Sequence, residues 1–185
     1  NITGPSTRSR DRPGTQLELL KEAIPNLSPV VVLWNPANTA ARVALTETEA
    51  AAHSWGIQLP SLEVRAPTPD LEGALQAASQ EGAMALMVIA DFLTKHYRAA
   101  IVAMAVKHRL PAMSTEPEYV PAGGLMSYAT TIDDLYRRAA ISVDKILKGA
   151  RPGDLPIEQP TTFELVINLK TAQALGQTIP PSLLF

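Results

Sequence analysis

The chain has 185 residues, of which 46% are hydrophobic and 18% charged, and its formal net charge is −2. This length and composition predict a folded globular protein with one sizeable core, and the balanced charge argues against nucleic acid or an anionic membrane as a partner. The chain has no cysteine, which excludes thiol nucleophiles, disulfides and thiolate metal sites.

The sequence begins with a polar stretch interrupted by Pro5 and Pro13, so residues 1–14 are predicted to form a linker. Helices and strands then alternate, with a helix at 15–24, a strand at 30–34, a helix at 39–55, a strand at 58–64, a helix at 71–80, a strand at 84–89, a helix at 97–108 and a strand at 112–114. The strand at 84–89 is apolar throughout, as a parallel strand covered on both faces requires. The alternation predicts an α/β protein, a three-layer α/β/α sandwich with a mostly parallel sheet.

The pattern changes after Gly123 and Gly124. An extended piece at 125–129 is followed by an amphipathic helix at 132–147, a proline-rich crossing at 149–160, a strand at 163–167 and a helix at 169–175. We therefore expect a compact lobe over 15–124, a crossing segment over 125–160 and a return to the lobe over 161–185.

Polar and aromatic side chains follow several predicted strands, at the edge where ligands bind in open parallel sheets. These candidate ligand-binding residues are Trp34, Asn35, Asn38, Thr39, Asp91, Phe92, Thr115, Glu116, Ser127 and Tyr128.

Structural explanations stand beside the ligand-binding ones. Asn38 or Thr39 could cap the following helix, and Trp34 could lie under that helix rather than stack on a ligand ring. Asp91 could hold a ligand amine or hydroxyl or simply form a turn, and Glu116 could be a surface acid.

The three histidines give no metal site or catalytic triad. His53 and His108 fall in predicted helices beside polar residues, and His96 has no partner at a metal-ligand spacing. No Ser-His-Asp order, nucleophile elbow or phosphate-binding glycine loop is present. The sequence therefore predicts a protein that is not an enzyme and has no cofactor or metal site.

Five stretches together resemble the substrate-binding proteins of bacterial ABC transporters, specifically the family that includes binders of tryptophan and related amino acids. They are LELLKEAIPNLSPVVVLWNPAN, ETEAAAHSWGIQL, VKHRLPAM, GGLMSYA and VDKILKGARPGDLPIEQPTTFELVINLKTAQALGQTIPPSLL, the last being long and distinctive.

This resemblance implies a Rossmann- or flavodoxin-like lobe of a type 1 periplasmic binding protein. It further implies a C-terminal portion of a longer, exported or lipid-anchored periplasmic protein, in which residues 1–4 form part of the hinge and the helix at 132–147 packs on a first lobe. Without that lobe, we expect the apolar side of this helix to favour a homodimer.

The same resemblance implies that a small molecule, an amino acid or an aromatic or carboxylate compound, is caught between two lobes and delivered to ABC permease subunits. The loop with Asn35, Asn38 and Thr39 corresponds to one that holds a ligand carboxylate in relatives. The other contacts map onto the loops after the third and fourth strands and onto the crossing at Ser127 and Tyr128. Alternative hypotheses are a ligand-sensing regulatory module and, less favoured, a doubly wound α/β enzyme.

Overall fold

The computed structural model describes residues 2–4, 12–160 and 162–184. Most of the predicted linker at 1–14 lies outside these residues. The chain divides into two compact units, one made of Asn1–Arg10 and Ala129–Glu164 and the other of Asp11–Tyr128 and Leu165–Phe185.

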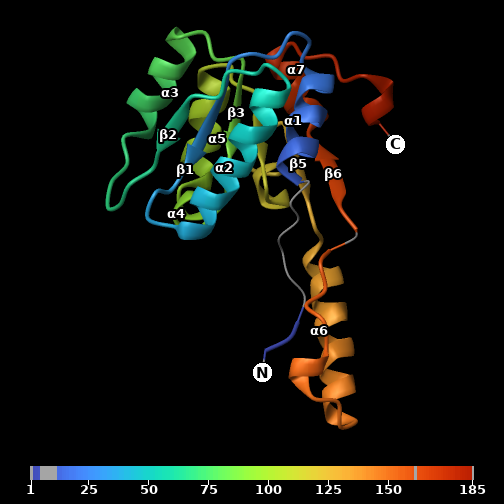
Figure 1. Ribbon diagram of the computed structural model, residues 1–185. Coiled ribbons are helices and arrows are strands. Elements are labelled where there is room, and N and C mark those ends of the chain that lie inside the picture. The colour runs from blue at the N-terminus through green and yellow to red at the C-terminus, as the bar shows by residue number, and fades with distance from the viewer. Residues whose placement is uncertain (1, 5–11, 161, 185) are drawn as a thin grey trace. The chain divides into compact units, whose positions relative to one another are not determined.

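Among the described residues, six strands form one sheet in the order β2-β1-β3-β4-β5-β6 (Figure 1). The strands are β1 (Val30–Trp34), β2 (Ser61–Glu63), β3 (Ala85–Val88), β4 (Ala112–Ser114), β5 (Met126–Ala129) and β6 (Glu164–Ile167). The pairs from β2 to β5 are all parallel, with Leu33 of β1 opposite Leu62 of β2 and Val88 of β3. The α/β fold with a mostly parallel sheet that the sequence predicts is confirmed.

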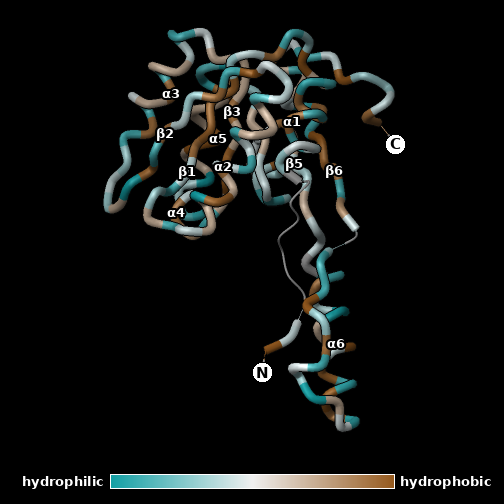
Figure 2. The backbone as a smooth tube through the Cα atoms, viewed as in Figure 1, coloured by the Kyte–Doolittle hydropathy of each residue, from teal (hydrophilic) through white to brown (hydrophobic). Residues whose placement is uncertain are grey.

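Two hydrophobic cores lie on opposite faces of this sheet, because successive side chains of a strand point to opposite sides. All five residues of β1 are buried, and they alternate between the cores: Val30, Val32 and Trp34 belong to the first, Val31 and Leu33 to the second. Figure 2 shows the resulting hydrophobic stretch along β1. Burial on both faces explains why the strands read as continuous apolar runs in the sequence.

Helices cover both faces. The first core is closed by α1 (Arg12–Ala23), α2 (Thr39–Ser54) and α7 (Leu169–Leu175), and the second by α3 (Leu71–Gln80), α4 (Phe92–His96) and α5 (Arg98–Lys107). In α2 the buried residues Ala41, Leu45, Thr48 and Ala52 recur at helical spacing and form its inner stripe.

Three details differ from the sequence prediction. Helix α1 begins at Arg12 instead of residue 15, and α4 is an additional short helix between β3 and α5. Short 3-10 helices occupy Pro117–Tyr119, Pro152–Asp154 and Pro181–Leu183. Each of these three begins with proline, whose fixed φ suits the first position of a helical turn.

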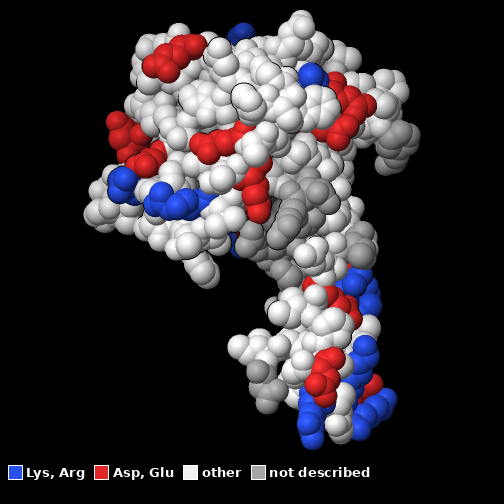
Figure 3. Space-filling model, viewed as in Figure 1, with Lys and Arg blue, Asp and Glu red and all other residues white. Residues whose placement is uncertain are grey.

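The smaller unit is built around α6 (Ile132–Leu147). Thr131 caps this helix by accepting the N–H of Asp134, and the Asp134 carboxylate lies 2.8 Å from Nε of Arg138. Acidic and basic side chains mix along the helix (Figure 3). Apolar side chains are also exposed on α6, with Tyr136 at 73% and Leu147 at 82%.

Candidate functional site

An open groove of about 950 Å³ lies at the carboxyl ends of three neighbouring strands. Residues 35–39 after β1, 65–66 after β2, and 91–93 with His96 after β3 line it. The position follows from the topology: the chain leaves β1 toward α2 on one face and leaves β3 toward α4 on the other, so the two loops diverge and leave a crevice. Ligands of open α/β sheets bind at such a switch point in strand order.

Asp91 is the centre of the hydrogen-bond network under this groove. Its Oδ1 accepts the backbone N–H groups of Leu93 and Thr94 at 3.0 and 2.9 Å. The Thr94 hydroxyl accepts the N–H of Asp91 in return, which completes a capping box at the start of α4. A five-residue helix without a hydrophobic repeat is therefore fixed by its cap.

The other carboxylate oxygen of Asp91 binds the loop after β1. Oδ2 accepts Nδ2 of Asn35 at 2.6 Å and Nδ2 of Asn38 at 3.3 Å. Residues that are 56 and 53 positions apart in the sequence are thus joined across the switch point. This bond network holds the two diverging loops together below the groove.

The two asparagine side chains are fixed in orientation by partners on both ends. Oδ1 of Asn35 accepts the N–H of Ala37 at 3.0 Å, and Oδ1 of Asn38 accepts the N–H of Ala40 at 2.9 Å. Asn38 is therefore the N-cap of α2, while Thr39 is the first helical residue and lines the groove.

The hydrogen-bond donors around Asp91 keep its carboxylate charged. Burial of the carboxylate would by itself raise its pKa, but hydrogen bonds from Thr94, Asn35 and Asn38 outweigh burial and lower the pKa below its ordinary value. Asp91 is an anion at neutral pH, and its charge is balanced by donors instead of a cation.

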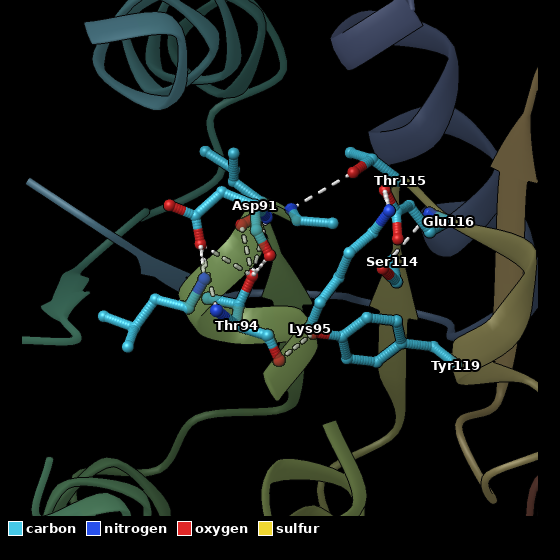
Figure 4. A network of polar contacts seen from close by, with 10 residues as sticks. Asp91, Thr94, Lys95, Ser114, Thr115, Glu116 and Tyr119 are labelled. Carbon is cyan, nitrogen blue, oxygen red and sulfur yellow. Dashed lines mark hydrogen bonds and ion pairs between the residues drawn. The ribbon is translucent and has the colours of Figure 1, made fainter. Parts of the chain in front are cut away.

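A second network joins α4 to the end of β4 (Figure 4). Nζ of Lys95 lies 2.7 Å from Oε1 of Glu116, and the hydroxyl of Tyr119 donates to the carbonyl of Thr94 at 2.8 Å. Burial raises the pKa of Tyr119 to about 12, so its hydroxyl stays protonated and can donate. Thr115 accepts the N–H of Ala90 at 3.2 Å, which ties this network to the loop after β3.

The structure brings half of the predicted site residues together at the groove and places the others elsewhere. Its lining includes Asn35, Asn38, Thr39, Asp91 and Phe92.

Phe92 is 92% exposed, which makes it an aromatic face open to solvent. Trp34 is buried instead of open to a ligand: its side chain is 4% exposed and belongs to the first core. The guanidinium of Arg42 covers its ring at 5.5 Å, and its indole N–H has no partner among the described residues.

The other predicted residues follow β4 or lie within β5, outside the lining of this groove. Glu116 is paired with Lys95, and its second oxygen, Oε2, is buried without a partner in the described part of the chain. Ser127 is fully buried in β5 and Tyr128 is half-buried against the first core.

Sequence reasoning missed several lining residues, chiefly Arg65, Ala66 and Leu93. Arg65 follows β2, which lies beside β1 with Glu63 opposite Trp34, and this neighbourhood is set by strand order. The sequence offered one usable signal, the polar ending of each strand at the same edge of the sheet.

The described residues form neither a metal cluster nor a membrane-spanning helix. No group of three His, Cys, Asp or Glu side chains there is close enough to hold a metal ion. None of the described helices has the length and apolar character needed to cross a membrane.

The sheet topology defines an α/β lobe with a groove at the carboxyl ends of its parallel strands. The sequence profile of the ABC transporter substrate binding protein family matches residues 1–185, so the chain belongs to this family. Among curated proteins, none matches the chain.

Two solved structures resemble the whole chain. One is a conserved domain protein from Vibrio cholerae, with 28% identity and a TM-score of 0.87. The other is an ABC domain in complex with L-Trp from Streptococcus pneumonia, with 27% identity and the same TM-score. Each match covers 100% of this chain and 61% of the other, so this chain spans less than two thirds of their length.

A third structure, the ligand-free, open form of a substrate binding protein with adhesive properties from Clostridium difficile, has a TM-score of 0.78 and 20% identity. That match covers 97% of this chain and 59% of the other. At this identity the likeness shows the fold alone.

Proposed function

We propose that this chain forms a lobe of a solute-binding protein for an ABC importer, and that its ligand is a small amino acid, aromatic or carboxylate compound. The observation that carries the proposal is the groove at the switch point between β1 and β3, lined by Asn35, Asn38, Asp91 and the exposed ring of Phe92. Membership of the substrate-binding family and the L-Trp complex of a relative with 27% identity support it.

In this proposal the protein binds its ligand and performs no reaction. A second lobe closes over the groove, and the closed form delivers the ligand to permease subunits outside the cytoplasmic membrane. Binding by hinge closure removes the ligand from water on both sides. One lobe alone removes only part of that water, so we expect weak binding by this chain in isolation.

The first experiment is a thermal-shift and calorimetric screen of amino acids and aromatic acids on the natural gene product that carries this chain, beside the chain alone. A ligand at about 100 times its Kd should stabilise the gene product by about 2.7 kcal/mol. No response of the gene product to any compound would count against the proposed ligand class. An equal response from the chain alone would refute the closure of two lobes.

A matched pair of variants tests whether the groove is the site. Phe92 and Leu169 are both exposed apolar residues at the first position of a short helix, after the caps Asp91 and Asn168, but only Phe92 lines the groove. Phe92→Ala should weaken ligand binding about tenfold, as loss of an aromatic stacking contact does. Leu169→Ala should leave binding unchanged, and equal effects of the two variants would place the site elsewhere.

We further propose that the chain alone forms a homodimer through α6. The exposed Tyr136, Val143 and Leu147 support this, because apolar side chains on one helix favour self-association. Light scattering should show a mass twice that of the chain at high concentration, and replacing the three residues by polar ones should give a monomer. A monomer from the unsubstituted chain at every concentration would refute the proposal.

A further inference from the structure

Helix α4 forms one wall of the groove, and little of it is buried. Phe92 and His96, four residues apart, lie on one side of this helix and line the groove together with Leu93. Of its five residues, all of them described, Thr94 is the one that is buried, while Leu93 is half-buried against the second core. Apolar burial therefore does little to fix the position of this wall.

Polar contacts outside the groove tie α4 to the segment after β4 (Figure 4). The hydroxyl of Tyr119 donates to the carbonyl of Thr94 at 2.8 Å, and Nζ of Lys95 lies 2.7 Å from Oε1 of Glu116. The groove lining includes none of these four residues. The helix that lines the groove is thus held from its other side.

The residues that hold α4 are themselves fixed by the fold. Tyr119 is 1% exposed within the second core, and its carbonyl accepts the N–H of Gly124 at 2.8 Å. The N–H of Glu116 donates to Oγ of Ser114, the last residue of β4, at 3.2 Å. Tyr119 and Glu116 therefore connect α4 to the core and to the sheet.

The Glu116 carboxylate faces Lys95 instead of the groove. Its Oε1 carries the ion pair, and its Oε2 is buried without a partner among the residues that the structure describes. A ligand in the groove meets Phe92 and His96, which line it, and the effect of Glu116 on that ligand passes through α4.

We infer that Tyr119 and Glu116 are positioning residues for this groove: they hold α4, and with it the ring of Phe92, where a ligand packs, and they do not touch the ligand. A helix of five residues is not stable by itself, so its contacts decide how often it is in place. Ligand affinity falls with the fraction of molecules in which the binding-competent arrangement is populated. The effect on a ligand rests on the proposed function, because it concerns the same groove.

Hydrogen exchange on the natural gene product tests the positioning without a ligand. Tyr119→Phe removes the hydroxyl and keeps the buried ring. It should speed exchange of the α4 amides, among them the N–H of Lys95 that donates to the carbonyl of Asp91, about fivefold, as loss of one hydrogen bond does. The amides of α2, on the other face of the sheet, should keep their rates. Unchanged rates in α4, or equal acceleration in both helices, would overturn the inference.

A double-mutant cycle tests whether Glu116 acts through Lys95. With L-tryptophan as the probe, calorimetry should show that Lys95→Gln and Glu116→Gln each weaken binding about threefold, in the range of a partly exposed ion pair. The double variant should bind no more weakly than either single variant. Lys107→Gln is the matched control, because Lys107 forms an ion pair of the same 2.7 Å length with Glu72 outside the groove lining, and it should leave binding unchanged.

A direct contact between Glu116 and the ligand would give a different result. Glu116→Gln would then weaken binding as much in the Lys95→Gln background as in the unsubstituted protein, which would overturn the inference. Lys95 is 45% exposed, so Lys95→Gln leaves the core intact.

The two proposals fail in different ways. If neither L-tryptophan nor any other compound of the screen binds, the proposed function fails, while hydrogen exchange still decides whether Tyr119 holds α4. If a compound binds and exchange in α4 is unchanged by Tyr119→Phe, solute binding stands and only the positioning is refuted.

Discussion

Replacing Asp91 by alanine is expected to lower the free energy of unfolding of this chain by about 3 kcal/mol. Loss of a helix cap costs about 1 kcal/mol, and each of the two hydrogen bonds from Asn35 and Asn38 contributes about 1 kcal/mol more. In the variant both amides lose their acceptor, because alanine offers no oxygen to the loop after β1.

Asp70→Ala is the matched control for this prediction. Asp70 is likewise the N-cap of a helix, α3, and accepts the N–H of Gly73 at 2.9 Å, but it is exposed and has no amide partners among the described contacts. Its loss should cost about 1 kcal/mol, the cap contribution alone. Urea unfolding followed by circular dichroism at neutral pH measures both variants, with unchanged slopes confirming comparable unfolded states.

The difference between the variants isolates the bonds between the two loops. If Asp91→Ala costs no more than Asp70→Ala, the network under the groove does not stabilise the fold, and the account of Asp91 as the link between β1 and β3 is wrong.

Three other perturbations have expected outcomes. Because the folded state lowers the pKa of Asp91, the charged carboxylate stabilises the fold above about pH 4, and this contribution is lost as pH falls through the folded pKa. Urea titrations should therefore show that the difference in free energy of unfolding between the unsubstituted chain and Asp91→Asn becomes smaller in acid. A difference that does not change with pH would contradict this. Trp34→Phe should lower the free energy of unfolding by no more than about 1 kcal/mol, because it also removes a buried N–H that has no partner among the described residues. Trp34→Ala should lower it by about 3–5 kcal/mol. Equal losses for the two variants would refute burial of the ring in the core. Gly124→Ala should lower the free energy of unfolding by about 2 kcal/mol or more, because the new Cβ would lie 2.8 Å from the carbonyl oxygen of Tyr119. Gly14→Ala is the control: its Cβ would lie 4.0 Å from the nearest atom, so thermal unfolding should show a neutral or stabilising effect. Similar melting temperatures for the two variants would contradict the close approach at Gly124.

The sheet could be predicted from the sequence because burial on both faces leaves a readable pattern. Val30 to Trp34 and Ala85 to Val88 are fully buried strands, and each is an unbroken apolar run. Helix α2 was equally readable from its cap at Asn38 and its long alanine-rich stretch. Helix α4 was missed because five residues are too few for a 3.6-residue repeat, so its cap alone defines it.

The candidate site could be predicted only in part. The polar ends of β1 and β3 were visible, and the parallel sheet predicts that they share an edge. The bonds from Asn35 and Asn38 to Asp91 depend on β1 and β3 being neighbours, and the presence of Arg65 depends on β2 lying on the other side of β1. Strand order is a property of the assembled sheet, and no local pattern in the sequence encodes it.

Asp91 and Phe92 are neighbours in the chain but contribute very differently to its stability. Phe92 is 92% exposed and lies beside a carboxylate that holds the loops, yet contributes almost no burial of its own. A substitution at such an exposed position changes the surface of the groove while leaving the free energy of unfolding nearly unchanged. A substitution at Asp91, in contrast, removes bonds that hold the loops after β1 and β3 together, so two adjacent positions differ widely in the change that the fold tolerates.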